Sequence, residues 1–127
     1  MIVVDTSALI AIVKQEAQDD ACKWALAQSD ITLISAGTFA ELMIVAEGKK
    51  LTSQLQALLQ ILDLDVIAVT QATALLCAQV YRNWGKGVHP AGLNFGDCFA
   101  YQLAKERNCP LLFVGNDFSQ TDIVSAI

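Results

Sequence analysis

The chain has one histidine, His89, and no two cysteines with the Cys-x-x-Cys spacing of many metal and redox sites. A zinc site based on histidine therefore has too few ligands. His89 stands in a segment that contains glycine and proline, where we expect a loop residue rather than a catalytic base. The cysteines are expected to be reduced and mostly buried, since free cysteine behaves as a small apolar side chain: Cys22, Cys77, Cys98 and Cys109.

Charged residues are also scarce, at 17% of the chain, yet no apolar run approaches the roughly 18 residues of a membrane span. The apolar start, MIVVDTSALIAIV, carries Asp5 and has none of the basic residues that begin a signal peptide. We therefore expect a cytoplasmic protein with no membrane partner. The net charge of −5 argues mildly against a protein that binds nucleic acid non-specifically, although bound cations would reverse the sign locally.

Apolar residues, in contrast, make up 54% of the 127 residues. That content excludes a disordered chain, and the length suits one domain, residues 1–127. Either a large core or a subunit interface must bury so much apolar surface. The helical leucine patterns at 55–62 and 75–80 are candidates for such an interface, and the sequence leaves both uses open.

Short apolar runs alternate along the chain with segments of helical periodicity. Strands are expected at 1–4, 31–34, 66–69 and 110–114, with a short fifth at 122–127. Helices are expected at 5–16, 19–28, 38–50, 52–64, 71–84 and 95–108. Apolar strands that alternate with helices predict an α/β fold, in which a parallel sheet of four or five strands is covered on both faces.

Acidic residues recur where a parallel sheet places its binding edge. Asp5 follows the first expected strand and Asp117 the fourth, at the carboxyl ends where such sheets bind ligands. Glu41 lies on a helical face that is otherwise small or apolar. Taken singly, each acid has a simpler explanation. Asp5 suits a helix cap, Asp97 suits a capping box with Asn94, Asp117 suits a turn, and Glu41 suits an exposed or lysine-paired position.

Taken together, the four carboxylates predict a cation site. Two carboxylates about 4 Å apart repel by roughly 4 kcal/mol at an effective dielectric constant of about 20, so clustered acids either stay protonated or share a cation. Oxygen ligands suit Mg²⁺ or Mn²⁺ better than zinc. A cation held this way leaves room for a phosphate oxygen and lowers the pKa of a bound water, which supplies a nucleophile.

Four segments resemble the VapC-type PIN-domain ribonucleases, the toxins of toxin–antitoxin pairs: VVDTSALIAI, FAELMIVAE, GKGVHPAGLNFGDCFAYQLAK and LLFVGNDFSQTDI. They cover nearly the whole chain in the order of the family, and HPAGLNFGDCFAY is the most specific. The resemblance implies a three-layer α/β/α fold and a metal-dependent endoribonuclease that hydrolyses RNA with a metal-activated water. It also implies a homodimer and a VapB-like antitoxin, whose C-terminal segment inserts near the active site.

The acidic quartet that the resemblance implies is, by position, Asp5, Glu41, Asp97 and Asp117. Asp5 and Asp97 would be the principal ligands of Mg²⁺ or Mn²⁺, and the other two would complete the pocket. Thr6 and Ser7 match hydroxyl positions that form hydrogen bonds at the site. Asn94 matches a residue that orients the acids and also caps a helix.

Some assignments stay open at this point. Asp122 lies close to Asp117 and is an alternative fourth acid. Arg82 and Lys86 are candidate phosphate contacts of the RNA, with a solvated surface charge as the alternative for each. Trp84 either stacks on an RNA base or packs in the core or at a dimer interface.

Two other functions compete with the ribonuclease. A structure-specific DNA nuclease of the PIN-like group would usually carry extra acids and a large arch, for which this chain is too short. A non-enzymatic module, such as a phospho-accepting receiver domain, would need an aspartate after the third strand and a late lysine. Here the third expected strand, VIAV, is followed by Thr70 and Gln71, which disfavours the receiver domain.

Overall fold

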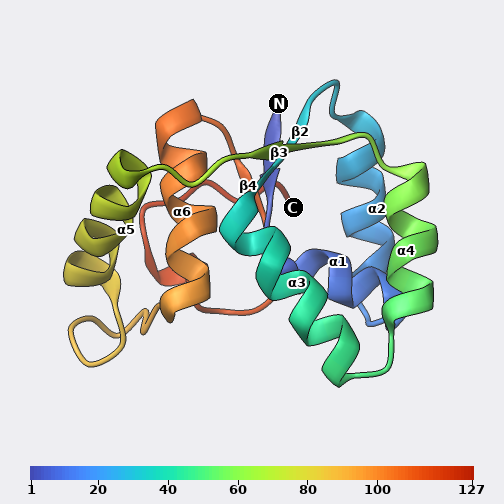
Figure 1. Ribbon diagram of the computed structural model, residues 1–127, viewed down its shortest axis with the longest axis horizontal. Helices are drawn as coiled ribbons and strands as arrows, with labels where there is room; N and C mark the ends of the chain where they lie inside the picture. Colours follow the sequence, from blue (N-terminus) through green and yellow to red (C-terminus); the bar gives the residue numbers. More distant parts are fainter.

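The computed structural model describes residues 1–127 and contains one sheet of four parallel strands (Figure 1). The strands are β1 (Ile2–Val4), β2 (Thr32–Ser35), β3 (Leu64–Ile67) and β4 (Leu111–Leu112), in the spatial order β3-β2-β1-β4. β1 pairs with β2 on one side and with β4 on the other. The strand order therefore reverses beside β1, and such a switch point is where parallel sheets bind ligands.

Six α-helices cover the sheet: α1 (Thr6–Val13), α2 (Asp19–Gln28), α3 (Ala36–Gly48), α4 (Thr52–Ile61), α5 (Gln71–Trp84) and α6 (Phe95–Arg107). A short 3-10 helix, η1 (Phe118–Gln120), follows β4. In Figure 1, α1, α2 and α4 lie on one side of the sheet, α5 and α6 lie on the other, and α3 contacts both α1 and α6. The predicted three-layer α/β/α fold is confirmed. None of the helices is both long and apolar enough to cross a membrane.

The sheet separates two apolar cores, because successive residues of a strand face opposite sides. Ile2 and Val4 pack in one core with residues of α1 to α4, whereas Val3 packs in the other with α5 and α6. Leu112 and Leu111 divide between the same two cores. Burial of each such side chain contributes roughly 1.5–3 kcal/mol to stability. The central strands therefore hold the residues that follow them in defined positions.

The third strand lies earlier in the chain than the sequence predicts. Leu64 is the first residue of β3 and pairs with Thr32, so the ladder with β2 includes a residue that the leucine pattern places in a helix over 52–64. The helix α4 ends at Ile61, and the next residue is already extended. Strand pairing thus overrides helical periodicity at this end of the sheet.

The sheet has four strands because the expected fifth, at 122–127, is reduced to one parallel bridge between Leu111 and Ser125. The chain leaves β4 after two residues and returns to donate a hydrogen bond from the Ala126 amide to the Leu111 carbonyl at 3.0 Å. The segment between these points therefore forms a loop that starts and ends at the same strand.

The helices proposed for a subunit interface are only partly covered. Leu55 is buried in the core, whereas Ile61 on the same helix is 81% exposed. On α5, Cys77 and Val80 are buried, and Leu75 is 65% exposed. Each leucine pattern thus serves the interior on one face and leaves apolar side chains uncovered on another.

Candidate functional site

Asp5 follows the carboxyl end of β1, and its two carboxylate oxygens lie in different environments. It is the N-cap of α1, and its Oδ2 accepts hydrogen bonds from the Ser7 amide at 3.0 Å and the Ser7 hydroxyl at 2.6 Å. Its Oδ1 is buried and has no hydrogen-bond partner. An unpaired buried oxygen costs free energy unless something coordinates it. The helix-cap explanation is therefore correct for one oxygen and leaves the other unexplained.

The hydroxyl of Ser7 joins Asp5 to the segment that follows the neighbouring strand, β4. Besides donating to Asp5, Ser7 Oγ accepts a hydrogen bond from the Val114 amide at 3.1 Å. Val114 follows β4 and precedes the loop that carries Asp117. Ser7 thus fixes the orientation of Asp5 and holds the ends of β1 and β4 together.

Glu41 extends from α3 towards the start of α1. Its Oε1 accepts a hydrogen bond from the Thr6 hydroxyl at 2.7 Å, and Thr6 also lies 3.4 Å from the Thr38 carbonyl. The side chain is half-buried, in agreement with the inward orientation predicted from its helical neighbours. One of those neighbours, Ile44, is nevertheless 71% exposed, so the apolar face is only partly an interior face.

Asp97 lies in the first turn of α6, in a capping box with Asn94. The Asn94 side chain accepts a hydrogen bond from the Asp97 amide at 2.9 Å, and Asp97 Oδ2 accepts one from the Asn94 amide at 3.0 Å. Asp97 is only 8% exposed. Its position in the capping box fixes the side-chain direction, so the cap and a role at the site are compatible.

The pKa values of Asp5 and Asp97 show that the predicted acids act on one another. Burial raises the pKa of Asp5 to about 6, with a further contribution from the charge of Glu41, while the hydrogen bonds from Ser7 oppose the shift. Burial raises the pKa of Asp97 to about 7, and the charges of Asp5, Asp117 and Glu41 add to it. Asp97 is thus close enough to the other three carboxylates to be repelled by each of them.

The two candidates for the fourth acid differ in their surroundings. Asp122 accepts hydrogen bonds from the Tyr101 hydroxyl and from Lys105 Nζ, the latter at 3.0 Å, and these interactions lower its pKa. Asp117 is exposed and adds its charge to the field at Asp97. The geometry favours Asp117, because Asp122 is already neutralised by residues of α6.

The chemistry of these side chains fits a hard divalent cation. All the candidate ligands are carboxylate or hydroxyl oxygens, which suit Mg²⁺ or Mn²⁺. The buried Oδ1 of Asp5 has no partner within the protein, and the charges around Asp97 need neutralisation. As the side chains stand, no group of three or more His, Cys, Asp or Glu residues is arranged to hold a metal ion.

The two candidate RNA contacts lie in different environments. Lys86 is exposed and lines an apolar groove of about 680 Å³ between α5 and α6, together with Asn94 and Phe95 at the start of α6. Arg82 is exposed on the last turn of α5 and does not line this groove. Of the two basic residues, Lys86 is therefore the one placed near the turn of α6 that carries Asp97.

Trp84, His89 and the cysteines have the structural roles that the sequence suggests for them. Trp84 packs against the core and lies 6.2 Å from the ring of Tyr101, so interior packing is correct and stacking on a base is not supported. His89 Nδ1 accepts a hydrogen bond from the Ala91 amide at 3.0 Å, as suits a loop residue. The four cysteines are free, and all but one are buried, as predicted: Cys22, Cys77, Cys98 and Cys109.

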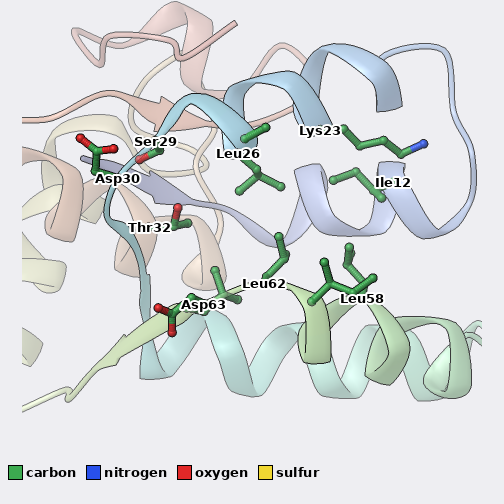
Figure 2. A pocket seen from close by; sticks show the side chains of 12 residues that line it. Ile12, Lys23, Leu26, Ser29, Asp30, Thr32, Leu58, Leu62 and Asp63 are labelled. Atoms are coloured by element: carbon green, nitrogen blue, oxygen red, sulfur yellow. The ribbon is translucent and has the colours of Figure 1, made fainter.

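A second groove, of about 530 Å³, lies between α2 and α4 and contains none of the four predicted acids (Figure 2). Its apolar wall includes Leu26, Leu58 and Leu62, and Asp30 and Asp63 stand at its rim. It opens near the amino ends of β2 and β3, whereas Asp5 and Asp117 follow the carboxyl ends of β1 and β4. The groove is therefore separate from the acidic site.

Comparison with known sequences connects this site to a family. The PIN domain profile matches residues 2–124. The chain is 41% identical over 131 residues to VapC ribonuclease Mb0625 of Mycobacterium bovis, with coverage of 98% of this chain and 97% of that protein. It is 40% identical over 126 residues to Ribonuclease VapC30 of Mycobacterium tuberculosis, with coverage of 97% and 96%.

Solved structures show the same fold at lower identity. Mycobacterium tuberculosis VapC20, described as a sarcin-ricin loop cleaving toxin, superposes with a TM-score of 0.79 at 17% identity, over 98% of this chain and 97% of that one. A chain of a toxin–antitoxin complex from Klebsiella pneumoniae gives a TM-score of 0.72 at 19% identity, over 100% and 98%. Fold and acidic site together define a PIN-type α/β protein. The chain belongs to the PIN domain family, in its VapC group.

Proposed function

We propose that this chain is a metal-dependent endoribonuclease, the toxin component of a type II, VapBC-like toxin–antitoxin system. The observation that carries the proposal is the buried, unpartnered Oδ1 of Asp5, together with the charges of Asp5, Glu41 and Asp117 that act on Asp97. The identity of about 40% to VapC ribonucleases over nearly the full length supports the same activity. The 127 residues act as one domain in this proposal.

The metal is Mg²⁺ or Mn²⁺, with Asp5 and Asp97 as principal ligands and Glu41 and Asp117 completing the pocket. When bound, such an ion activates a water and stabilises charge on the scissile phosphate. The protein supplies orientation: Ser7 directs Asp5, Thr6 directs Glu41, and Asn94 directs Asp97. Hydrolysis in line gives 5′-phosphate and 3′-hydroxyl ends. No histidine is needed as a general base.

Lys86 is the candidate contact for the phosphate backbone, because it is exposed and lines the groove that begins at Asn94 and Phe95. Because the net charge is −5, a single lysine beside the site is a clearer candidate for a phosphate contact than it would be on a basic surface. Arg82, exposed on the last turn of α5, is a second candidate contact.

The protein partners are a VapB-like antitoxin and a second copy of the chain. Two chains of similar fold come from toxin–antitoxin assemblies of Klebsiella pneumoniae and Rickettsia felis, and this supports an antitoxin. Exposed apolar side chains support a homodimer, above all Leu75 on α5 and Phe95 at the start of α6, which are 65% and 77% exposed. Light scattering of the purified chain, alone and with its antitoxin, tests both partners.

The function is tested with the purified protein and end-labelled tRNA, mRNA and branched DNA, with Mg²⁺ or with EDTA. Cleavage of RNA that requires Mg²⁺ and disappears in Asp97→Asn is expected, and the variant controls for a contaminating nuclease. Cleavage of branched DNA in preference to RNA would establish the competing DNA nuclease instead. A protein that binds RNA without cutting it in Mg²⁺ would be a non-enzymatic module.

A further inference from the structure

A glycine, Gly96, occupies the second position of α6, where glycine is unfavourable. Glycine stabilises a helix less than any residue except proline, and alanine stabilises it most. Glycine is often retained for a positive φ angle, but that explanation applies to Gly87, Gly92 and Gly115 and not to Gly96. The reason for a glycine at position 96 must therefore lie in the space around it.

That space is filled by the carboxylate of Glu41. A β-carbon built on Gly96 would lie 1.8 Å from Glu41 Oε2, 2.5 Å from its Cδ and 3.0 Å from its Oε1. Non-bonded carbon and oxygen atoms do not approach so closely, so any side chain at position 96 would displace the carboxylate. Glu41 thus reaches across from α3 and lies directly against the α6 backbone.

A second glycine makes the contact between α3 and α6 reciprocal. A β-carbon on Gly37 of α3 would lie 2.5 Å from the ring of Phe99 on α6. Each helix therefore contributes one glycine to receive a side chain of the other, Glu41 at Gly96 and Phe99 at Gly37. The two contacts fix the position of α3 relative to α6, and with it the distance between Glu41 and Asp97.

We propose that Gly96 is a positioning residue of the acidic site: its missing side chain admits the Glu41 carboxylate to the first turn of α6, beside Asp97. The Thr6 hydroxyl holds Oε1 at 2.7 Å, and the bare backbone of Gly96 leaves room for Oε2. The amino end of a helix also favours a nearby carboxylate. The proposal rests on the proposed function only where it links this placement to metal binding and RNA cleavage.

The test compares Gly96→Ala with Gly48→Ala as a matched control. Gly48 is the last residue of α3, and a β-carbon there would meet nothing within 4 Å. Gly96→Ala should weaken Mn²⁺ binding, measured by calorimetry, and reduce kcat for RNA cleavage about 10- to 100-fold, since misplacement of one group by about 1 Å has effects of that size. Gly48→Ala should leave both quantities unchanged.

A double-mutant cycle separates displacement of Glu41 from a general change in the helix. In Glu41→Ala, the three atoms nearest to a β-carbon at position 96 are removed, so adding Gly96→Ala should cause no further loss of Mn²⁺ affinity or activity. The melting temperature should then rise, because alanine now favours the helix without a clash. In the unchanged background the same substitution should lower the melting temperature.

Two outcomes would overturn the proposal. One is a Gly96→Ala variant with unchanged Mn²⁺ affinity and cleavage. The other is an equal loss in both backgrounds, which would mean that Gly96 acts independently of Glu41. If the unchanged protein shows no metal-dependent RNA cleavage, the proposed function fails, while the reversal of the melting-temperature change still tests the contact itself.

Discussion

The hydroxyl of Thr6 donates a hydrogen bond to Oε1 of Glu41 at 2.7 Å, which joins the first residue of α1 to the middle of α3. These residues belong to different helices, and both lie beside the carboxyl end of β1. The contact therefore couples the helix capped by Asp5 to the helix that carries a second acid. Its removal should disturb the acidic site more than the fold.

Thr6→Val keeps the shape of the side chain and removes the hydroxyl. We expect RNA cleavage to fall roughly tenfold, because Glu41 is no longer held in one orientation. The free energy of unfolding should change by only about 1–2 kcal/mol, the usual contribution of one such hydrogen bond. Thr6→Ser, which keeps the donor, should retain most activity. Thr73→Val, which removes a hydroxyl that bonds Thr70 in the first turn of α5, is the control and should cut RNA normally.

Asp97→Asn tests the electrostatic relation among the acids through the pH dependence of stability in EDTA. Burial and the neighbouring charges raise the pKa of Asp97 from 3.8 in its reference state to about 7. The folded protein therefore binds more protons than the unfolded chain between these pH values, and this residue makes unfolding easier as pH rises through the window. The substituted amide carries no charge, so the variant should gain stability relative to the unchanged protein, by roughly 1–3 kcal/mol above about pH 7.

The measurement is urea unfolding of both proteins at intervals from about pH 4 to about pH 8. Asp65→Asn, at an exposed position on β3, is the control for replacement of an aspartate by an amide elsewhere in the fold. A difference between Asp97→Asn and the unchanged protein that is constant with pH would contradict the raised pKa of Asp97.

Ser7→Ala should affect both stability and activity. The substitution removes one of the two donors to Asp5 Oδ2 and leaves the Val114 amide without its acceptor. Loss of a partner for a buried or half-buried polar group costs about 1–3 kcal/mol. Thermal unfolding and RNA cleavage are the measurements, and Ser53→Ala, on the exposed side of α4, should match the unchanged protein in both. An unaltered melting temperature would show that the contact of Ser7 with the Val114 amide contributes nothing to stability.

Asp117→Ala and Asp122→Ala distinguish the two candidates for the fourth acid. Asp117→Ala should weaken Mn²⁺ binding and cleavage while the melting temperature in EDTA stays the same or rises, because a repelling charge is lost. Asp122→Ala should cost up to about 1 kcal/mol of stability through the contacts with Tyr101 and Lys105, and should leave Mn²⁺ affinity within about twofold. The opposite pattern of Mn²⁺ affinities would transfer the role to Asp122.

Local patterns in the sequence are sufficient to predict the layers of the fold and the parallel orientation of its strands. Val3 and its neighbours form an apolar run without polar alternation, which is typical of a strand buried on both faces. Leu64 ends the segment 52–64 in which a helix is expected, and its pairing with Thr32 decides for a strand. Partners distant in the chain decide the edges of the sheet, as they usually do.

The acids are predictable because each follows a strand or lies on a helix beside one. The simpler explanations for Asp5 and Asp97 are compatible with a role at the site, since each uses Oδ2 for its cap. The contact of Glu41 with Gly96 is not predictable, because it depends on the crossing of two helices. The one available signal is an unfavourable glycine inside a helical pattern, directly before Asp97.

Because the two oxygens of Asp5 have different roles, one substitution could remove the proposed activity and keep the fold. Asparagine at position 5 would keep an oxygen to accept the hydrogen bonds from Ser7, and so would preserve the start of α1. It would replace the other oxygen with an amide nitrogen, which cannot coordinate a cation. If the proposed function holds, Asp5→Asn would thus give a folded protein without metal-dependent cleavage, and its surface outside the acidic site would be unchanged.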